Sequence, residues 1–419
     1  MKLLISTLII LINLQLGFAF AEPRSYVMSV AGIQTMPGSD VFYGLNVSGP
    51  DLAIDADMVT AVVEAYGVPW DVFVESETPS NDHIWTKTMI NMAANLRSGG
   101  KPIILQLLLT RERLTGLAMA DQSLKPNDDW ASKCFNFSGD NKKYTLAYAR
   151  YASWMTRIFK PRQVIVAVEV NEYLHTCGRG DGWNSVVEVS NIAYEAVKAV
   201  DTQILAYPSF TAGPLYLDYI NGFDSNTYEL LGALKRDRFG FSIYPKILKR
   251  ADDKPPLPSD LPADLLTRVR DRNPKEKPIS ITETGWNSNS MSYGTPNNCV
   301  TNAVISTEDE ATTYMRWLLQ NSQTNNVKLV TWWSKRDLLP KAVMGACYPT
   351  VGLFSLWACD GDIHCSAVNI FRKAFGGDGV LGELVYKIFG TMGLYDYNGK
   401  PKSALLGEWK KHLAQNFHE

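Results

Sequence analysis

Two glutamates follow short runs of apolar, mostly β-branched residues, and their types and positions suit catalysis. Glu172 ends the run that begins at Val164, and Glu283 ends the run that begins at Pro278. A carboxylate that closes a buried strand is costly unless a partner compensates it. Two carboxylates that meet in space can serve as acid, base or nucleophile in cleaving a glycosidic bond. We therefore expect the two glutamates to share one site.

The alternation of side chains along a strand predicts which residues share a face with each glutamate. These faces are Val164, Val166, Val168, Val170 and Glu172 in the first run, and Ile279, Ile281 and Glu283 in the second. If both faces point into a barrel, both carboxylates lie at its mouth. Glu169 has the opposite parity, so we expect it to point toward the surrounding helices and assign it no role.

The rest of the chain predicts the elements that hold these residues. Strands are expected at 41–47, 70–74, 103–109, 164–171, 204–207, 239–245, 279–282 and 327–333. Helices are expected at 55–66, 83–96, 144–159, 185–200, 226–234, 263–270, 307–319, 382–389 and 403–414. Short apolar strands that alternate with helices are typical of a parallel sheet covered on both faces. Eight such units predict an α/β fold, a closed (β/α)8 TIM barrel in a single domain with long loops after its strands.

An open, doubly wound sheet fits the sequence less well. Such a sheet would place a glycine-rich phosphate loop after its first strand. Residues 44–49 follow the first expected strand and do not match the GxGxxG pattern. The barrel is therefore the predicted fold.

The first residues have the pattern of a signal peptide. Lys2 supplies a positive start, residues 3–18 are mostly apolar, and residues 19–21 form a small-x-small cleavage site. We expect residues 1–21 to be removed, residues 22–419 to form the catalytic barrel, and the mature protein to be secreted without a membrane span. An uncleaved membrane anchor is the alternative.

An even number of cysteines suits the oxidising compartment that secretion implies. They are Cys134, Cys177, Cys299, Cys347, Cys359 and Cys365. All follow predicted strands, and we expect Cys134 to pair with Cys177 because they lie in neighbouring loops. The pairing of the other four stays open. Asn46 and Asn136 begin glycosylation sequons.

The composition excludes some classes of partner. The net charge is -2, so there is no electrostatic case for binding nucleic acid or anionic membranes. The hydrophobic fraction of 46% is enough for a large core. No cysteine or histidine spacing matches a common zinc site, and we expect neither a metal nor an organic cofactor. We expect a monomer.

The two glutamate stretches resemble clan A of the glycoside hydrolases. In that clan an Asn-Glu pair ends the fourth strand and a lone Glu ends the seventh, which matches Asn171-Glu172 and Glu283. Residues 282–286 are similar to the nucleophile motif of family 17, the β-1,3-glucanases. This chain has Asn287 where that family has Pro, and Val170 where it has Gly.

A third motif extends the resemblance to the sixth strand. Residues 240–245 are similar to the sixth-strand motif of family 53, the β-1,4-galactanases. The three motifs indicate the clan and leave the family and the substrate open.

The resemblance implies roles for four residues. Glu283 is the nucleophile and Glu172 the acid/base of a retaining mechanism. Asn171 binds the sugar 2-hydroxyl, and Tyr244 orients Glu283. These roles predict a secreted retaining β-glycosidase that acts on a polysaccharide or oligosaccharide.

Aromatic side chains near the strand ends are candidates for stacking on a sugar ring. Either Trp332 or Trp333 can face inward, but not both, and Trp286 is a weaker candidate.

Three alternatives remain open. A barrel that binds carbohydrate without turning it over would need the aromatics alone. A transglycosylase would use the same residues as a hydrolase. An acidic sugar substrate could be bound by basic residues near the strand ends, which are Arg111, Arg113, Lys335 and Arg336.

Overall fold

The computed structural model describes most of the chain. The described residues are 23–33, 48–63, 68–111, 116–117, 134–211, 230–247, 256–271, 273, 277–349, 365, 368–369 and 380–417. The predicted signal peptide, the strand expected at 41–47, Asn46, Arg113 and Cys359 lie outside them.

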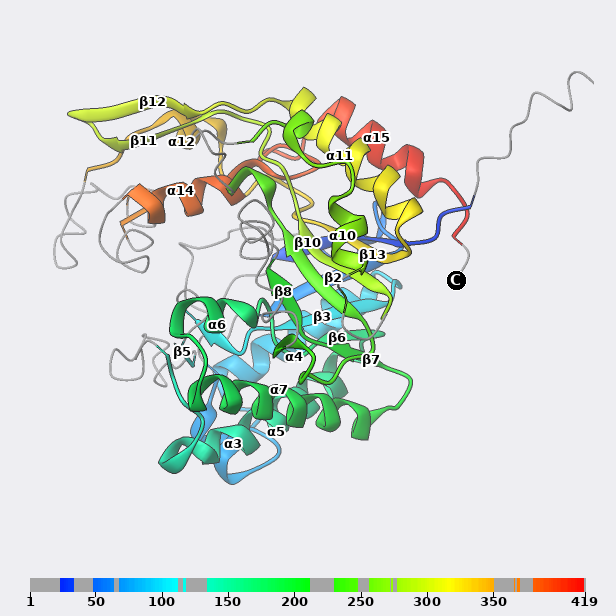
Figure 1. Cartoon of the computed structure of the whole chain (residues 1–419), viewed down its shortest axis with the longest axis vertical. Coiled ribbons are helices and arrows are strands. Elements are labelled where there is room, and N and C mark those ends of the chain that lie inside the picture. The colour runs from blue at the N-terminus through cyan, green and yellow to red at the C-terminus, as the bar shows by residue number, and fades with distance from the viewer. Residues whose placement is uncertain are drawn as a thin grey trace, which may run out of the picture.

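A sheet of nine parallel strands forms the centre of the described structure (Figure 1). The order across the sheet is β7-β6-β3-β2-β1-β13-β10-β9-β8. The bounds are β1 (Val27–Ile33), β2 (Met58–Val63), β3 (Ile103–Leu107), β6 (Gln163–Ile165), β7 (Leu205–Tyr207), β8 (Ser209–Thr211), β9 (Phe239–Ile243), β10 (Ile279–Thr284) and β13 (Val327–Trp332).

The sheet closes on itself at Pro208. This residue separates β7 from β8, which lie at opposite ends of the sheet order but follow each other in the chain. The backbone N–H of Val166 donates to the Tyr207 carbonyl at 2.9 Å, and the N–H of Ser209 donates to the Ala167 carbonyl at 2.8 Å. Counting β7 and β8 as one interrupted strand, the nine strands occupy eight positions, so the fold is the predicted (β/α)8 barrel.

The inside of the barrel has an apolar floor with a polar layer above it. The floor includes Val27, Met58, Ile104, Ile165, Tyr207 and Leu329. Two residues further along three strands, hydroxyl groups face one another: Ser29 and Thr60 are 2.7 Å apart, and Thr60 and Thr331 are 3.5 Å apart. Hydroxyls that bond to one another can be buried at little cost.

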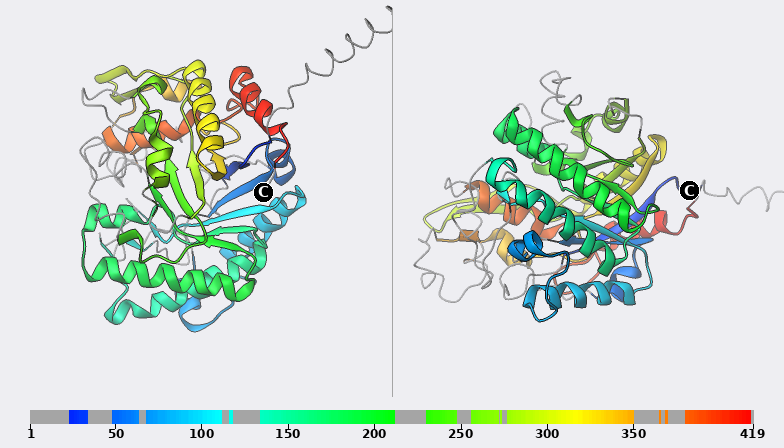
Figure 2. Two further views of the ribbon diagram at one scale, coloured as in Figure 1. Left: turned by 45° about the vertical axis from the view of Figure 1, so that its right-hand side comes forward. Right: turned by 90° about the horizontal axis from the view of Figure 1, so that it is seen from below.

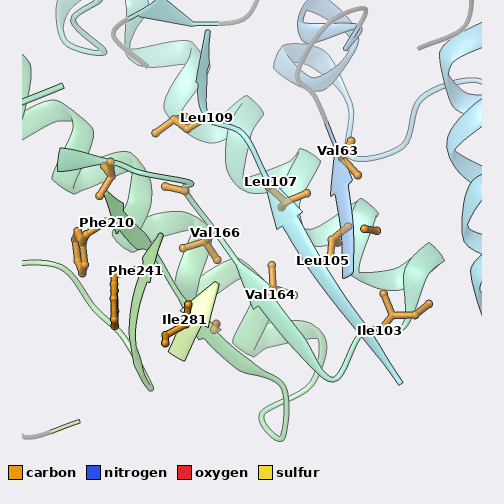
Figure 3. Packing of buried hydrophobic residues seen from close by; sticks show 14 of the residues in the cluster. Val63, Ile103, Leu105, Leu107, Leu109, Val164, Val166, Phe210, Phe241 and Ile281 are labelled. Carbon is orange, nitrogen blue, oxygen red and sulfur yellow. The ribbon is translucent and has the colours of Figure 1, made fainter. Parts of the chain in front are cut away.

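The other face of each strand packs against helices (Figure 2). The helices are α2 (Gly49–Ala53), α3 (Trp70–Glu75), α4 (Ile84–Ser98), α5 (Lys143–Phe159), α6 (Asn171–Cys177), α7 (Asp181–Val200), α10 (Leu265–Asp271), α11 (Glu308–Thr324), α12 (Lys341–Gly345), α14 (Val380–Ile388) and α15 (Ser403–Leu413). Figure 3 shows the apolar strand residues of this outer core, among them Leu105, Val164, Phe241 and Ile281. Nearly all-apolar strands form here because both of their faces are buried.

The prediction was wrong about the first two units of the chain. The first barrel strand is β1, and the helix expected at 55–66 contains strand β2 instead. Residues 70–74, expected as a strand, lie in α3. All six residues of β2 are buried, and a short apolar run of that kind has no periodicity to separate strand from helix. In α3, Trp70 and Phe73 are three residues apart and point into the core together, which is a helical spacing.

From the third strand onward the predicted elements are present. His83 caps α4 by accepting the N–H of Trp85, and Thr307 caps α11 by accepting the N–H of Glu310. The predicted start of α7 at Ser185 was late, since the helix begins at Asp181. Of the helix expected at 226–234, only the residues from 230 onward are described, and Leu230 and Leu231 are helical.

Smaller elements lie in the segments that connect the barrel strands to the helices. They are the hairpins β4 (Thr110–Arg111) with β5 (Gly116–Leu117) and β11 (Met291–Thr295) with β12 (Asn298–Val304), and the 3-10 turns Gly139–Lys142, Pro245–Ile247, Pro258–Asp260 and Phe389–Thr391. In Figure 1 the hairpin of β11 and β12 projects from the barrel beside α14.

Disulfides link segments that follow the barrel strands. Cys134 is bonded to Cys177 at the end of α6, which confirms that predicted pair. Cys299 in β12 is bonded to Cys347. Cys365 is also in a disulfide.

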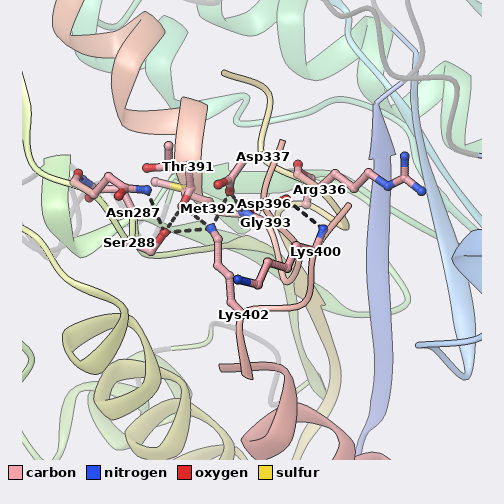
Figure 4. Close-up of polar contacts among 12 residues, drawn as sticks. Asn287, Ser288, Arg336, Asp337, Thr391, Met392, Gly393, Asp396, Lys400 and Lys402 are labelled. Carbon is pink, nitrogen blue, oxygen red and sulfur yellow. Dashed lines mark hydrogen bonds and ion pairs between the residues drawn. The ribbon is translucent and has the colours of Figure 1, made fainter. Parts of the chain in front are cut away.

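A buried cation joins four segments that follow different elements (Figure 4). Lys402, just before α15, contacts Asp337 at 2.5 Å and donates to the Ser288 hydroxyl at 2.7 Å and to the Thr391 carbonyl at 3.1 Å. Lys402 and Asp337 are 7% and 3% exposed. A buried charge of this kind is tolerable only while its partners are in place.

Candidate active site

Glu283 lies at the carboxyl end of β10 and is turned into the barrel by an irregularity in the strand. Ile279 and Ile281 belong to the outer core against the helices. The register with β9 shifts between Ile281 and Glu283, so the alternation of faces is interrupted there. Ile279, Ile281 and Glu283 were expected to share an inward face, and this expectation was wrong for the two isoleucines. The shift brings Glu283 to the side of Tyr244, whose phenol donates to Glu283 Oε2 at 3.0 Å.

The fourth barrel strand is shorter than predicted, and this changes the direction of the side chains that follow it. Strand β6 ends at Ile165, and residues 166–170 form bends and turns. Val164 and Val166 face the outer core, whereas Ile165 and Val168 line the barrel interior. Parity therefore does not carry through to Glu169 and Glu172, because alternation holds only within a strand.

Glu169 is held at the barrel mouth by β8. Its backbone N–H donates to the Ser209 hydroxyl at 2.9 Å, and the N–H of Val170 donates to the Ser209 carbonyl at 2.9 Å. Its φ is 49°, a left-handed conformation that is uncommon for a residue other than glycine. Its side chain is partly exposed, and the Ser242 hydroxyl of β9 lies near enough to lower its pKa. The expectation that Glu169 points toward the helices was wrong.

Ser242 lies near Glu169 and is also the strand neighbour of Glu283. In the register of β9 and β10, Ser242 is the partner of Glu283, and Tyr244 follows two residues later. The sequence assigned no role to Ser242 or Ser209. The motif at 240–245 contains Ser242, which was the available signal, whereas nothing in the sequence pairs Ser209 with Glu169.

The electrostatics confirm that Glu169 and Glu283 influence each other. Burial raises the pKa of Glu283 well above its usual value, the charge of Glu169 raises it further, and the Tyr244 hydrogen bond lowers it. Burial raises the pKa of Glu169 to about 7, the nearby Ser242 hydroxyl lowers it, and the charge of Glu172 raises it. Two carboxyls coupled in this way cannot both ionise readily, so they hold a proton between them near neutral pH.

Glu172 lies in the first turn of α6 and is partly exposed. Burial raises its pKa to about 7. Its charge acts on Glu169, and Glu169 is the carboxylate whose charge acts on Glu283. Charge interactions therefore connect Glu172 to Glu169 and Glu169 to Glu283.

Asn171 connects the start of α6 to β8. Its side chain donates to the Thr211 carbonyl at 3.0 Å and accepts the Thr211 N–H at 2.7 Å. The side chain is buried, with 2% of the residue exposed. The amide that the sequence assigned to a sugar hydroxyl thus already bonds to the backbone on both its nitrogen and its oxygen.

The eighth strand resolves which tryptophan faces the site. Trp332 is fully buried, donates its indole N–H to the Met392 carbonyl at 2.7 Å, and packs against Trp409 of α15. Trp333 is partly exposed, packs against Phe389, and has an indole N–H with no partner among the described residues. Phe389 in turn packs against the ring of Tyr244 at 4.9 Å. Trp333 is therefore the tryptophan that lies on the side of Glu283.

Two further candidates for ligand binding are occupied by contacts within the protein. Trp286 is fully buried against Tyr314 of α11, so it offers no face to a sugar. Lys335 forms a buried ion pair with Asp55 at 2.8 Å, which leaves it unsuited to bind an acidic substrate. Asn136 is partly exposed, as its predicted glycosylation would require.

Two further features concern metals and membranes. Among the described residues there is no group of three or more side chains of the types that ligate metals. No helix within the described ranges combines the length and apolar character needed to cross a bilayer.

Comparison with known proteins gives matches at the level of structure. No family model and no curated protein sequence matches the chain. A GH5_18 protein from Bifidobacterium longum subsp. infantis superposes with a TM-score of 0.55 at 12% identity, over 94% of this chain and 80% of its own. An exo-beta-1,4-mannosidase from Opitutaceae bacterium strain TAV5 gives 0.54 at 12% identity, over 94% and 60%.

A third structure contains a bound sugar. A GH5_18 variant from Bifidobacterium longum subsp. longum, in complex with Manb1-4GlcNAc, gives a TM-score of 0.53 at 11% identity, over 88% of this chain and 73% of its own. The chain has the fold of the clan A glycoside hydrolases. Identities this low establish the fold alone, so the chemistry of this barrel has to be argued from its own residues.

Proposed function

We propose that the protein is a retaining β-glycoside hydrolase that cleaves a polysaccharide or oligosaccharide by double displacement. The observation that carries the proposal is the coupled carboxyl pair at the mouth of the barrel, with Tyr244 bonded to Glu283. Active sites of such barrels lie at the carboxyl ends of the strands, where these residues are. Retaining glycosidases need two carboxyls about 5–5.5 Å apart, one as nucleophile and one as acid/base.

Glu283 is proposed as the nucleophile. It is 7% exposed, so its oxygens are shielded from competing water, and Tyr244 holds one of them. The ionised carboxylate attacks the anomeric carbon while the glycosidic oxygen leaves as an alcohol. The clan pattern gives Glu172 the role of acid/base, which protonates that oxygen and then takes a proton from water. Trp333 is proposed to stack on the sugar ring.

The substrate class follows from the neighbours and is proposed on that basis. One of them binds Manb1-4GlcNAc and another is an exo-beta-1,4-mannosidase. We propose β-mannosides as the first substrates to test, followed by β-1,3-glucans and β-1,4-galactans because of the motifs at 282–286 and 240–245.

The experiment is a screen for hydrolysis followed by product analysis. Nitrophenyl β-mannoside, β-glucoside and β-galactoside, with mannan, laminarin and galactan, are incubated with the wild type and with Glu283→Ala. We expect hydrolysis with retention at the anomeric carbon, seen by NMR, and its loss in the variant. Full activity in Glu283→Ala, or inversion, would overturn the mechanism.

The same screen separates the alternatives. Transfer of the glycosyl group to an added oligosaccharide, seen by product sizing, would indicate a transglycosylase. Binding of these glycans without any turnover would indicate a carbohydrate-binding barrel.

We also propose that the protein is exported, with residues 1–21 removed and Asn136 glycosylated where the host allows it. The disulfides support this, because they form in oxidising compartments. Sequencing the amino terminus of the exported protein should show Glu22 first, and size-exclusion chromatography should show a monomer. A chain that remains in the membrane with residues 1–21 attached would refute cleavage.

A further inference from the structure

We infer that Glu169, and not Glu172, is the acid/base that exchanges the proton with the glycosidic oxygen and then with water. The inference rests on the proposed function and changes the residue that the sequence pattern assigns. It is drawn from the way β8 and β9 position Glu169 at the barrel mouth.

The backbone of Glu169 is fixed by neighbours on the side of the site. Ser209 binds the N–H groups of both Glu169 and Val170, one through its hydroxyl and one through its carbonyl. With φ at 49°, the chain turns so that the side chain reaches Ser242, the register partner of Glu283. A left-handed conformation costs about 1–3 kcal/mol and persists where the surroundings enforce it, often at active sites.

The charge of Glu172 acts on Glu169, and the charge that acts on Glu283 is that of Glu169. Glu172 lies on α6. An acid/base has to share one sugar residue with the nucleophile, and in retaining enzymes this limits their separation to about 5–5.5 Å. Because its charge acts directly on Glu283, we infer that Glu169 is the carboxyl that meets this requirement.

The exposure of Glu169 and Glu283 fits these roles. Glu283 is nearly buried, while Glu169 is partly exposed and can reach a leaving group and water. The Tyr244 hydrogen bond favours the ionised form of Glu283, and the charge of Glu172 favours the protonated form of Glu169. We assign Glu172 as a positioning residue that keeps the proton on Glu169.

The reaction balances in two steps. The Glu169 carboxyl gives its proton to the glycosidic oxygen as the bond to the anomeric carbon breaks, and a Glu283 oxygen forms an ester with that carbon. The Glu169 carboxylate then takes a proton from water as the water oxygen attacks the anomeric carbon. The ester bond breaks, Glu283 is released as a carboxylate, and Glu169 is protonated again.

The first test needs no turnover and therefore stands apart from the proposed function. Glutamate carrying carbon-13 in its side-chain carboxyl is incorporated, and the Glu283 signal is assigned by its loss in Glu283→Gln. Its titration is followed by NMR in the wild type, Glu169→Gln and Glu172→Gln. We expect the pKa of Glu283 to fall in Glu169→Gln by clearly more than in Glu172→Gln. The reverse order would overturn the inference, and circular dichroism checks that each variant is folded.

The second test uses leaving groups of different quality. With a nitrophenyl or alkyl β-glycoside, Glu169→Gln should lower kcat/KM by about 10²–10⁴-fold, which is the usual contribution of general acid–base catalysis. With a dinitrophenyl glycoside, which needs no acid, the loss should be small at the first step, and azide should restore turnover by replacing water. Glu172→Gln should lose less than Glu169→Gln and gain nothing from azide.

The two tests distinguish a wrong choice of acid/base residue from a wrong proposed function. Azide rescue in Glu172→Gln but not in Glu169→Gln would return the acid/base role to Glu172. If the wild type hydrolyses no glycoside, the proposed function fails, while the NMR titration still decides which glutamate lies beside Glu283.

Discussion

At the residue scale, three glutamates of the same chemical type differ because of what surrounds them. Glu283 accepts a hydrogen bond from Tyr244, Glu169 has the Ser242 hydroxyl nearby, and Glu172 has burial alone as the cause of its raised pKa. Hydrogen bonds to a carboxylate stabilise its charged form, whereas burial destabilises it. The distribution of charge among the three is therefore set by a few hydroxyl groups.

Tyr244→Phe tests this at the nucleophile. The tyrosine hydrogen bond lowers the pKa of Glu283, so its removal should raise that pKa and move the acid limb of the kcat/KM profile to higher pH. A hydrogen bond to a charge contributes about 1.5–3 kcal/mol, which corresponds to a shift of about one pH unit or more. Tyr207→Phe is the matched control, because its hydroxyl bonds to Gln163 at 2.6 Å on the barrel floor. An acid limb that stays in place in Tyr244→Phe would contradict the assignment.

Glu169→Gln should stabilise the protein in a pH-dependent way. The pKa of Glu169 is about 7 in the folded state against 4.5 for the free group, so the folded state binds more protons between these values. Stability should therefore fall as pH rises through this window. The variant should exceed the wild type by about 3 kcal/mol at pH 7 and match it near pH 4, measured by urea unfolding. Glu188→Gln, on an exposed part of α7, controls for the substitution. Equal variant and wild-type stabilities across the range would refute the raised pKa.

At the element scale, the junction of β6, α6 and β8 positions Glu169 and Glu172, two of the carboxyls proposed to take part in catalysis. Strand β6 covers only Gln163–Ile165, and Glu169 lies in the turns that follow it. The peptide groups of this irregular segment bond to Ser209 rather than to a continuing strand. Because buried backbone groups need partners, the short strand β8 determines the path of the chain here.

Asn171→Ala should weaken this junction. Both hydrogen bonds to Thr211 would be lost, leaving backbone groups without that partner, at a cost of about 2 kcal/mol in the free energy of unfolding. Asn191→Ala is the control, since Asn191 makes the same type of two-sided bond to Ala233 and Lys235 in an exposed setting. It should cost less.

The kinetics of the Asn171 variant distinguish a structural role from a sugar contact. If the amide acts through Thr211, Asn171→Ala lowers kcat/KM by the same factor for a glycoside and for its 2-deoxy analogue. A loss confined to the parent glycoside would instead support the predicted contact with the 2-hydroxyl.

At the scale of the whole molecule, buried charges fasten the segments around the barrel mouth. Lys402 binds groups that follow β10, β13 and α14 and itself precedes α15. Burial raises the pKa of Asp337 to about 6, and the charge of Lys402 lowers it. The pair is a connection between distant parts of the chain, and it depends on both partners.

Lys402→Met should be strongly destabilising. It leaves Asp337 buried without its cation, which typically costs about 3–5 kcal/mol. Without Lys402 the pKa of Asp337 should rise above 6, so the loss should be greatest at neutral pH and smaller in acid, where Asp337 is protonated. Lys235→Ala, which removes the exposed pair with Glu195 at 2.6 Å, should cost less than about 1 kcal/mol. Thermal unfolding at two pH values measures both, and a pH-independent loss would contradict the explanation.

The sequence by itself determined the barrel from its third strand onward, the paired cysteines Cys134 and Cys177, and Glu283 with Tyr244 as neighbours at strand ends. These features depend on local patterns: apolar runs, capping residues and the order of strands. It failed at 55–66 and 70–74 because short apolar runs lack a distinguishing period.

Only the tertiary structure shows that Glu169 is held at the barrel mouth and that Trp332 is buried while Trp333 is partly exposed. A register shift in β10 and the early end of β6 break the alternation on which a sequence prediction relies. Ser209 and Ser242 come from strands far along the chain: the Ser209 hydroxyl accepts the backbone N–H of Glu169, and the Ser242 hydroxyl lies near its carboxyl. Where the backbone leaves regular structure, the direction of a side chain is set by its non-local hydrogen bonds, and no local pattern encodes them.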